Sequence, residues 1–225
     1  MISVVIPTLN AEQSLAYCLA RLVSGVVTGL VREVVIADGG STDETARIAE
    51  ATGARFVAAP KGRGSQLAAG AEAARGDWLL FLHADTVLEQ GWENEAGEFI
   101  ERVGPDRAAV FRFALDDFGT GARRLEKLVA LRCWLFGLPY GDQGLLISRR
   151  FYRKIGGFRS MPLMEDVDIV RRLGARNIVM LRTRAVTSSA KFRERGYFAR
   201  SAKNLGLLTL YFLRVPPRVL ARLYG

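Results

Sequence analysis

Short apolar segments alternate with segments of helical period along the first half of the chain. The apolar segments predict buried strands at 2–6 and 33–37 and further strands at 55–58 and 78–82, and the segments between them predict helices at 11–24, 41–51 and 64–75. This alternation is typical of an α/β fold with a mostly parallel central sheet and helices on both faces. Because ligands of such folds bind at the carboxyl ends of the strands, we expect the residues after Ile6, Ala37 and Leu82 to meet in one crevice.

The second half of the chain has a less regular pattern. It predicts strands at 108–114, 144–148 and 177–181, and helices at 122–136, 165–173 and 197–213. Pro216 and Pro217 then end the last helix, and a short basic tail follows. A weak boundary at Gly104 and Pro105 predicts a single domain over 1–225 with two halves, 1–104 and 105–225.

Composition narrows the class of protein. With 225 residues, of which 49% are hydrophobic, the chain is long enough to bury a core, and disorder is excluded as its main state. Lys and Arg number 32 against 23 Asp and Glu, a net charge of +9 that favours an anionic partner such as a nucleotide, a phosphate, a nucleic acid or an acidic membrane face. The basic residues are scattered and form no known nucleic-acid-binding motif, so we expect no nucleic-acid partner.

Targeting patterns and cysteines predict the compartment. No leader pattern follows Met1, and the longest uncharged apolar runs, 22–31 and 204–213, are ten residues each, well short of the about 18 that span a bilayer. We therefore expect a cytoplasmic protein that is soluble or at most peripheral to the inner face of the membrane. Cys18 and Cys133 lie in apolar stretches without the spacing of a metal site, which favours two buried free thiols over a disulfide.

The loop after the first strand disfavours three classes of nucleotide-binding enzyme. Pro7-Thr8-Leu9-Asn10 stands where a dinucleotide-binding fold carries G-x-G-x-x-G, and the chain has no G-x-x-x-x-G-K-[ST]. The loop also lacks the glycine-rich, basic signature of an enzyme that makes sugar nucleotides. Hydride transfer, P-loop hydrolysis and nucleotidyl transfer therefore lose support.

Polar side chains follow two other predicted strands. Asp38 precedes Gly39 and Gly40, so its carboxylate is able to approach a base or ribose closely, or simply to close a turn. His83 and Asp85 follow the fourth strand and fit either a divalent-cation site or a strand cap. The residues themselves leave both pairs of alternatives open.

Charged clusters mark the second half of the chain. Glu165, Asp166 and Asp168 open a predicted helix, where the helix dipole accounts for Glu165. An acid that points into an anion-binding crevice needs a chemical reason, which makes Asp166 the stronger candidate. Arg193 and Arg195 belong to a basic run that either holds a phosphate or forms a solvated face.

Taken in order, these motifs resemble the family 2 glycosyltransferases of the GT-A fold. The segments that carry the resemblance, over residues 2–173, are Pro7-Thr8-Leu9-Asn10, Asp38-Gly39-Gly40-Ser41-Thr42-Asp43, Gly76-Asp77-Trp78, Leu82-His83-Ala84-Asp85-Thr86, Gly156-Gly157-Phe158 and Glu165-Asp166. Phe81–Thr86 and Leu163–Asp168 are also similar to a bacterial subgroup known as rSAM/selenodomain-associated transferase 2, or arsenosugar-biosynthesis glycosyltransferases.

The resemblance implies a nucleotide-sugar site in the half 1–104 and an acceptor site in the half 105–225. It places Pro7, Thr8, Asn10 and Glu12 along the nucleoside, Asp38 and Gly39 at the base, typically uracil, and Arg63 and Gln66 on the far side of the nucleotide.

The resemblance also implies a divalent cation. Asp85 matches the last acid of the family's D-x-D motif, which binds Mn²⁺ or Mg²⁺ at the diphosphate of the donor. His83 replaces the first acid of that motif and is a candidate metal ligand or sugar contact, and Ala84 lies between the two beside the donor. The replacement leaves one carboxylate at the metal.

Asp166 matches the general base of the family, and Glu165 is expected to hold the acceptor or the start of its helix. Arg193 and Arg195 are expected to close over the diphosphate. The function implied is metal-dependent transfer of a sugar, with inversion, from a nucleotide-diphosphate donor, expected to be a UDP-sugar, to an acceptor hydroxyl.

Two other functions and the identity of the acceptor stay open. The missing first acid of D-x-D suggests a non-catalytic relative, and the charge of +9 suggests a basic nucleic-acid-binding protein. A lipid-linked molecule is one alternative for the acceptor. The apolar and basic stretch 205–224, with Leu207, Leu208, Tyr211 and Phe212, either contacts a membrane surface or packs on the domain.

Overall fold

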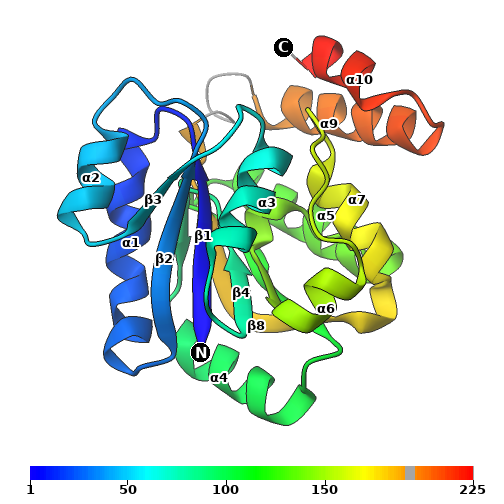
Figure 1. Ribbon diagram of the computed structural model, residues 1–225. Coiled ribbons are helices and arrows are strands. Elements are labelled where there is room, and N and C mark those ends of the chain that lie inside the picture. Colours follow the sequence, from blue (N-terminus) through cyan, green and yellow to red (C-terminus); the bar gives the residue numbers. More distant parts are fainter. Residues whose placement is uncertain (191–195, 225) are drawn as a thin grey trace.

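The computed structural model describes residues 1–190 and 196–224, and its centre is one eight-stranded sheet (Figure 1). The strands are β1 (Ile2–Thr8), β2 (Val31–Asp38), β3 (Arg55–Ala58), β4 (Trp78–Phe81), β5 (Thr86–Leu88), β6 (Ala108–Leu115), β7 (Leu145–Ser148) and β8 (Ile178–Thr187). They lie in the order β3-β2-β1-β4-β7-β6-β8-β5. The β1–β2, β1–β4, β2–β3 and β6–β8 pairs are parallel, whereas β7 and β5 run antiparallel to their neighbours. The α/β fold class with a mostly parallel sheet is confirmed.

Helices cover both faces of this sheet (Figure 1). They are α1 (Glu12–Val27), α2 (Thr45–Ala51), α3 (Arg63–Ala73), α4 (Trp92–Val103), α5 (Thr120–Phe136), α6 (Arg149–Lys154), α7 (Glu165–Leu173), α9 (Tyr197–Phe212) and α10 (Pro217–Tyr224), with 3-10 turns η1 (Gly141–Gln143) and η2 (Ala175–Asn177). Helices α1 and α4 share one hydrophobic cluster with the sheet, whereas α3, α6 and α7 share a second. Helix α5 packs on the end of β6 in a third cluster.

Strand β1 explains why its sequence is a continuous apolar run. Val4 and Ile6 belong to the cluster with α1, whereas Val5 between them belongs to the cluster with α3. Successive side chains of a strand point to opposite faces, and both faces of this strand are covered, so each position is buried. Since burial of one such side chain contributes about 1.5–3 kcal/mol, β1 is a main element of the core.

The first strand is longer than predicted. It continues through Pro7 to Thr8, with Pro7 opposite Ala37 of β2. The ladder between β1 and β4 ends at Val5. The missing N–H of Pro7 therefore breaks no hydrogen bond to β4, and the prediction that this strand ends before Pro7 is wrong.

Helix α2 begins later than predicted, at Thr45 instead of near 41. The hydroxyl of Ser41 donates to Asp38, and the backbone N–H of Thr42 donates to Oδ1 of Asn10. These two residues thus connect the ends of β1 and β2 and do not cap a helix. Asp43 accepts hydrogen bonds from the backbone N–H and the hydroxyl of Thr45 at the true start.

The structure contains elements that the sequence analysis missed. Strand β5 pairs antiparallel with β8, and α4 follows it. The buried residues Trp92, Ala96 and Phe99 of α4 recur at helical spacing, which is the pattern that would have predicted this helix. The division into halves at 104–105 stays a prediction, and all eight strands belong to one sheet.

The C-terminal segment forms a helical hairpin of α9 and α10 at one edge of the molecule (Figure 1). The basic tail that follows the two prolines forms α10, and Pro217 occupies its first turn, where proline is favoured. Leu207 and Leu208 of α9 are buried, so half of the apolar set considered for a membrane surface packs inside the chain. Within 1–190 and 196–224, no helix has the length and apolar character needed to cross a membrane.

The two cysteines are buried free thiols, as predicted. Burial, with a smaller effect from the charge of Asp85, raises the pKa of Cys18 to about 12. Burial also raises the pKa of Cys133. Both thiols are therefore protonated at neutral pH and chemically inert.

Candidate active site

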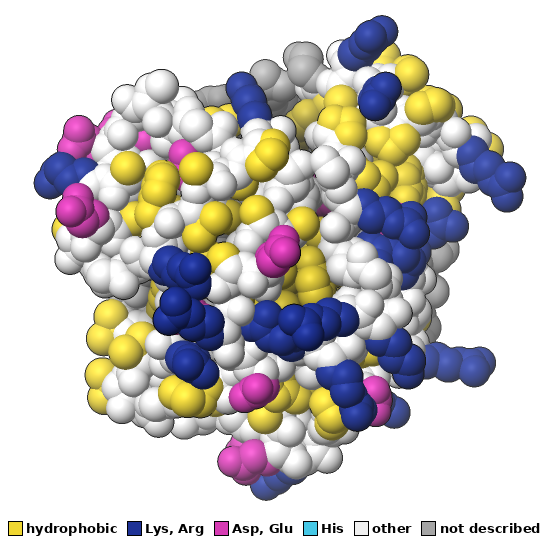
Figure 2. All heavy atoms as spheres, in the orientation of Figure 1, with side chains coloured by type: hydrophobic (Ala, Val, Ile, Leu, Met, Phe, Trp, Pro, Cys, Tyr) yellow, Lys and Arg dark blue, Asp and Glu magenta, His cyan; other side chains and the backbone are white. Residues whose placement is uncertain are grey.

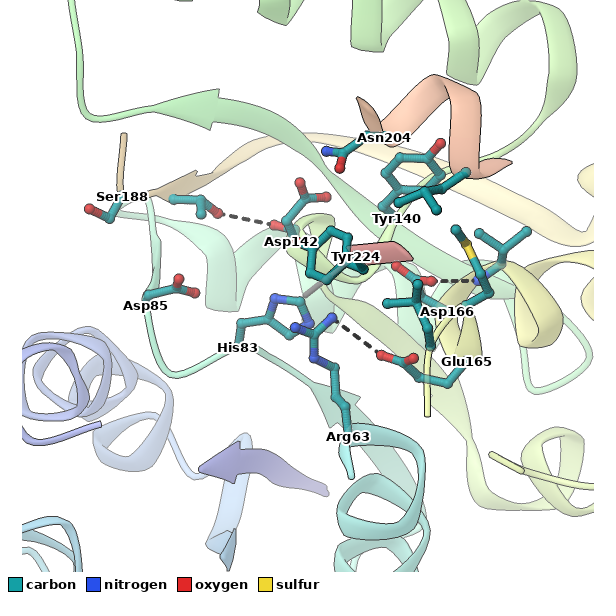
Figure 3. A pocket seen from close by; sticks show the side chains of 15 residues that line it. Arg63, His83, Asp85, Tyr140, Asp142, Glu165, Asp166, Ser188, Asn204 and Tyr224 are labelled. Carbon is teal, nitrogen blue, oxygen red and sulfur yellow. Dashed lines mark hydrogen bonds and ion pairs between the residues drawn. The ribbon is translucent and has the colours of Figure 1, made fainter. Parts of the chain in front are cut away.

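A cleft of about 190 Å³ opens beyond the carboxyl end of β4 (Figure 3). The loop after β4, the turn η1, the start of α7 and the helices α9 and α10 supply its walls. It brings together a group of predicted site residues from distant parts of the chain: Arg63, His83, Asp85, Glu165 and Asp166. Of the three strand ends expected to meet in one crevice, the one after Leu82 lies in this cleft, whereas the residues after Ile6 and Ala37 are not among those that line it.

Backbone N–H groups hold the carboxylate of Asp166 in the first turn of α7. Gly141 donates to Oδ2 at 3.0 Å, and Val167 donates to Oδ1 at 2.7 Å. Met164, the residue directly before α7, has a φ of 68°, in the left-handed region that residues with side chains seldom adopt. Strain of this kind is concentrated at functional sites. A carboxylate fixed on the wall of a cleft is able to accept a proton from a hydroxyl group bound there.

Glu165 points to the other side of the α7 start and forms an ion pair with Arg63. Nη1 of Arg63 lies 3.2 Å from Oε1 of Glu165, whose side chain is 2% exposed against 50% for the arginine. Burial and, next, the charge of Asp166 raise the pKa of Glu165, and Arg63 opposes both. Glu165 is thus a buried acid that depends on Arg63 for its charge.

Asp142 in η1 is a cleft residue that the sequence analysis did not select. Its Oδ1 atom is buried and has no hydrogen-bond partner among the residues that the structure describes. Burial raises the pKa of Asp142 to about 6. The charge of Arg132 opposes this shift, and the charges of Asp166 and Asp85 add to it. The polar loop Gly141-Asp142-Gln143-Gly144 was visible in the sequence, but nothing in its spacing linked it to Asp85 or Asp166.

His83 and Asp85 line the same cleft and offer the donor atoms of a divalent-cation site. Within the described ranges, no three His, Cys, Asp or Glu side chains are grouped closely enough to hold a metal ion unaided. The carboxylate of Asp85 nevertheless suits Mn²⁺ or Mg²⁺, and the buried Oδ1 of Asp142 is an acceptor atom that a nearby cation would stabilise. Since Mg²⁺ commonly takes only one or two carboxylates and completes its shell with phosphate oxygens and water, the residues present fit such an ion.

Asp38 closes a turn at the end of β2, and its carboxylate is buried. Oδ1 accepts from the hydroxyls of Thr8 and Ser41 at 2.8 and 2.5 Å, and Oδ2 accepts from the backbone N–H groups of Gly40 and Ser41 at 2.9 and 2.7 Å. Burial favours the neutral acid, but these hydrogen bonds outweigh it and hold the pKa of Asp38 below its ordinary value. The turn function is therefore present, and contact with a base stays a prediction.

The other residues predicted along the nucleoside also have structural contacts. Nε2 of Gln66 donates to the carbonyls of Thr8 and Ala37 at 2.6 and 3.0 Å, so this buried side chain joins the ends of β1 and β2. Oε2 of Glu12 accepts from the backbone N–H of Glu44 at 3.1 Å. These contacts hold the ends of β1 and β2 together.

Several predicted residues are not among those that line the cleft: Pro7, Thr8, Asn10, Glu12, Asp38, Gly39, Gln66 and Ala84. Arg193 and Arg195 lie outside the described residues. The cleft also includes Asn204 and Leu207 of α9 and Tyr224 of α10, which the sequence analysis had not placed near a site. No local motif surrounds these three residues, so only the fold reveals their position.

Comparisons with known proteins identify the family and the fold of the chain. The sequence matches the family described as "Glycosyl transferase family 2" over residues 3–162. A glucosyl-3-phosphoglycerate synthase of Mycolicibacterium paratuberculosis is 38% identical over 95 residues, which cover 38% of this chain and 29% of that protein. A PGL/p-HBAD biosynthesis glycosyltransferase of Mycobacterium bovis is 38% identical over 95 residues, covering 39% of this chain and 36% of its own length. The chain thus matches only about a third of these curated relatives.

Solved structures show the same fold. One is the glucosyl-3-phosphoglycerate synthase of Mycobacterium tuberculosis in complex with Mn²⁺, UDP-glucose and phosphoglyceric acid. It has a TM-score of 0.56 and 26% sequence identity to this chain, and the match covers 81% of this chain and 69% of that one. The same enzyme in complex with Mg²⁺ and UDP has a TM-score of 0.57 and 23% identity, over 83% and 70%. From the family match over most of its length and the shared fold, the chain belongs to glycosyl transferase family 2.

Proposed function

We propose that the chain transfers a sugar from a UDP-sugar to an acceptor hydroxyl, with inversion at the anomeric carbon and with Asp166 as the general base. The observation that carries this proposal is the carboxylate of Asp166, fixed by the N–H groups of Gly141 and Val167 on the wall of the cleft that His83 and Asp85 also line. The similar structures that contain UDP-glucose and Mn²⁺ or UDP and Mg²⁺ support the choice of donor and ion.

The proposed reaction is a single displacement. Asp166 accepts the proton of the acceptor hydroxyl while its oxygen forms a bond to the anomeric carbon. The bond from that carbon to the β-phosphate oxygen breaks, and its electron pair leaves with UDP. Glu165 and Asp168, the two other acids of the α7 start, are ion-paired with arginines, so a single attack from the face opposite UDP, with inversion, is the expected course.

His83 and Asp85 are the residues that would hold a divalent ion. Such an ion, when bound, supplies positive charge that stabilises the departing diphosphate. Arg63, which lines the same cleft, adds a positive charge. Partial burial lowers the pKa of Arg63, but the charges of Glu165 and, next, Asp166 outweigh this effect and raise it above the ordinary value.

The similarity to the rSAM-associated subgroup rests on Phe81–Thr86 and Leu163–Asp168 and stays a prediction. A membrane contact is not part of the proposed function, because Leu207 and Leu208 are buried within the chain. The acceptor is proposed only as an alcohol at this point.

Thermal shift with UDP, GDP, TDP and CMP, each with and without Mn²⁺, tests the donor site, since a ligand of the folded state raises the melting temperature. UDP with Mn²⁺ is expected to give the largest shift, and Asp85→Ala is expected to remove the Mn²⁺ effect. No shift with any nucleotide would instead favour the non-catalytic alternative.

The catalytic base is tested separately, by release of UDP from UDP-glucose with an added alcohol as the acceptor of the glucosyl group. Asp166→Asn is expected to keep the UDP and Mn²⁺ shift and to lower UDP release at least ~100-fold, the usual scale of general-base catalysis. Asp106→Asn, at an acid that is 60% exposed and outside the cleft, is the matched control and is expected to keep both properties. Wild-type turnover by Asp166→Asn would contradict the assignment.

A further inference from the structure

One set of residues in the cleft comes from the start of α7 and from the C-terminal hairpin. We call it the hairpin-side wall; its members are Leu163, Met164, Val167, Asn204, Leu207 and Tyr224. The donor and metal functions proposed above use none of them. This wall adjoins Asp166, because Met164 and Val167 flank the Glu165-Asp166 pair in the sequence.

The hairpin-side wall is uncharged. Four of its side chains are apolar, and the other two, Asn204 and Tyr224, are neutral hydrogen-bonding groups. Figure 3 shows Tyr224 and Asn204 projecting from the C-terminal helices among the polar residues of the cleft. An aromatic ring and a neutral amide that line the same cleft are able to bind a sugar or similar polyol, since the ring covers its apolar face while the amide pairs with a hydroxyl.

The hairpin holds Tyr224 in position. Nζ of Lys203 donates to the carbonyl oxygen of Tyr224 at 2.8 Å and lies 5.5 Å from the centre of its ring. Leu220, one turn earlier in α10, is fully buried. Tyr224 is therefore a fixed part of the wall, and the charge of Lys203 is directed to the end of α10.

The charges of the cleft disfavour an anionic acceptor. Its described lining carries the acids Asp85, Asp142, Glu165 and Asp166. Against them stands Arg63, which already pairs with Glu165 at 3.2 Å. A phosphate or carboxylate on the acceptor would meet this acidic surface and the uncharged wall, whereas a neutral acceptor meets no repulsion from like charges there.

The outer surface of the hairpin extends the apolar character of the wall. Leu205, Leu213 and Leu223 are 62%, 70% and 54% exposed. Figure 2 shows hydrophobic side chains gathered over α9 and α10, with basic residues around them. An acceptor that carries an apolar part beside its hydroxyl groups finds complementary surface in this region.

We propose that the hairpin-side wall is the acceptor subsite and that it selects an uncharged alcohol with an apolar part, such as an alkyl glycoside, over an anionic acceptor. This inference rests on the proposed function, since it takes Asp166 as the base. It distinguishes the chain from the similar solved enzyme, whose complex contains phosphoglyceric acid.

Two probes test the selection on the full chain saturated with UDP and Mg²⁺. The probes are 3-phosphoglycerate and n-octyl β-D-glucopyranoside, the latter kept below its critical micelle concentration. Binding of each is measured by calorimetric titration and by saturation-transfer NMR. The glucoside is expected to bind and 3-phosphoglycerate to show no saturable binding. Tyr224→Ala and Asn204→Ala are expected to weaken glucoside binding at least fivefold, whereas Tyr224→Phe, which keeps the ring, retains it.

Tyr17→Ala is the matched control, because Tyr17 of α1 is a tyrosine whose side chain is 71% exposed and which does not line the cleft. It is expected to bind the glucoside as the wild type does. UDP affinity, measured on each sample, is expected to be the same in all four variants. A folding defect would lower both affinities together and would be visible in the UDP titration.

The outcomes separate the two proposals. If UDP fails to bind the wild type, the proposed function and the acceptor subsite both fall. If UDP binds but the glucoside does not, or if 3-phosphoglycerate binds instead, only the acceptor inference is overturned. Glucoside binding that is unchanged in Tyr224→Ala and Asn204→Ala overturns the placement of the subsite.

Discussion

The backbone N–H of Gly141 donates a hydrogen bond of 3.0 Å to Oδ2 of Asp166. This contact connects η1 with the first turn of α7. A Cβ atom added at Gly141 would lie 2.7 Å from Nε2 of His83 and 3.5 Å from Cβ of Asp166. The proposed base, Asp166, and the proposed metal ligand, His83, therefore both pack against the backbone of Gly141.

Gly141→Ala is expected to displace His83, because 2.7 Å is shorter than a carbon–nitrogen contact allows. The variant should need about 10-fold more Mn²⁺ for half-maximal UDP binding, the lower end of the 10–100-fold range for groups that orient metal ligands. UDP release should fall as well. Titration of Mn²⁺ at fixed UDP checks this prediction.

Gly97→Ala in α4 is the control for this substitution. A Cβ atom at Gly97 would have no neighbour within 4 Å. Removing a glycine from a helix interior is expected to stabilise the chain by about 0.5–1 kcal/mol without any effect on the Mn²⁺ requirement. Equal Mn²⁺ curves for the two alanine variants would show that His83 does not hold the ion.

Asp38→Asn tests the turn between β1 and β2. The amide has one acceptor oxygen, so it cannot replace the carboxylate toward the N–H groups of Gly40 and Ser41 and the hydroxyl of Thr8 together. Loss of hydrogen bonds to a buried charged group is expected to cost about 1–3 kcal/mol. Urea unfolding at pH 7 measures the change.

The pH dependence of that difference follows from the direction of the pKa shift. Asp38 has a lower pKa in the folded chain than its ordinary value of about 3.9. Its stabilising effect is therefore complete above that value and is lost as the pH falls through the folded-state pKa. Wild type and Asp38→Asn should converge in stability toward acid pH, and a constant gap would contradict the proposed cause.

Arg63→Gln tests the ion pair under the cleft. It leaves Glu165, 2% exposed, without its cation, and so raises the pKa of this acid further. A raised folded-state pKa costs stability as the pH rises through it, so the variant should match the wild type near pH 4 and lose stability toward pH 8. Because Arg63 is 50% exposed, we expect a loss of about 1–2 kcal/mol, below the range for a fully buried pair.

The double variant Arg63→Gln with Glu165→Gln decides whether this loss comes from the unpaired charge. Removing both charges is expected to restore most of the stability at pH 8, as for buried ion pairs replaced by neutral groups. Unfolding by urea at pH 4, 6 and 8 supplies the comparison. A double variant as unstable at pH 8 as Arg63→Gln would assign the loss to packing instead.

The sequence predicted the parts of the fold that depend on short-range periodicity. β3 and α7 were predicted at the observed bounds, and β1, β2 and β4 within one or two residues. The side chains of β1 and β4 are buried along most of each strand, and those of α7 are buried at helical spacing, a pattern that is present in the residues themselves. β3 lies at the edge of the sheet and is mostly exposed. The start of α2 was wrong because Ser41 and Thr42 bond to residues of other segments.

Prediction of the site was limited by contacts that only the folded chain forms. Asp166 and Asp85 were found from motifs, since each lies in a short segment typical of the family. Asp142 and Tyr224 lie in the same cleft without such a segment. Their position depends on η1 meeting α7 and on α10 folding back onto α9, and no local pattern encodes either contact.

Gly64, in the first turn of α3, packs against the loop before α7 and so contacts the second half of the chain. A Cβ atom here would lie 2.2 Å from the carbonyl oxygen of Arg159 and 3.1 Å from the backbone N of Met161. Because both are backbone atoms, no side-chain rotation relieves the clash, and α3 must separate from the loop before α7. Gly64→Ala is expected to cost about 3 kcal/mol, the upper end for overpacking. Since Arg63 would move away from Glu165, the variant should also show the same loss of stability toward pH 8 as Arg63→Gln. Urea unfolding at pH 4 and pH 8 measures both effects, and a stability equal to that of Gly97→Ala at either pH would refute the close backbone contact.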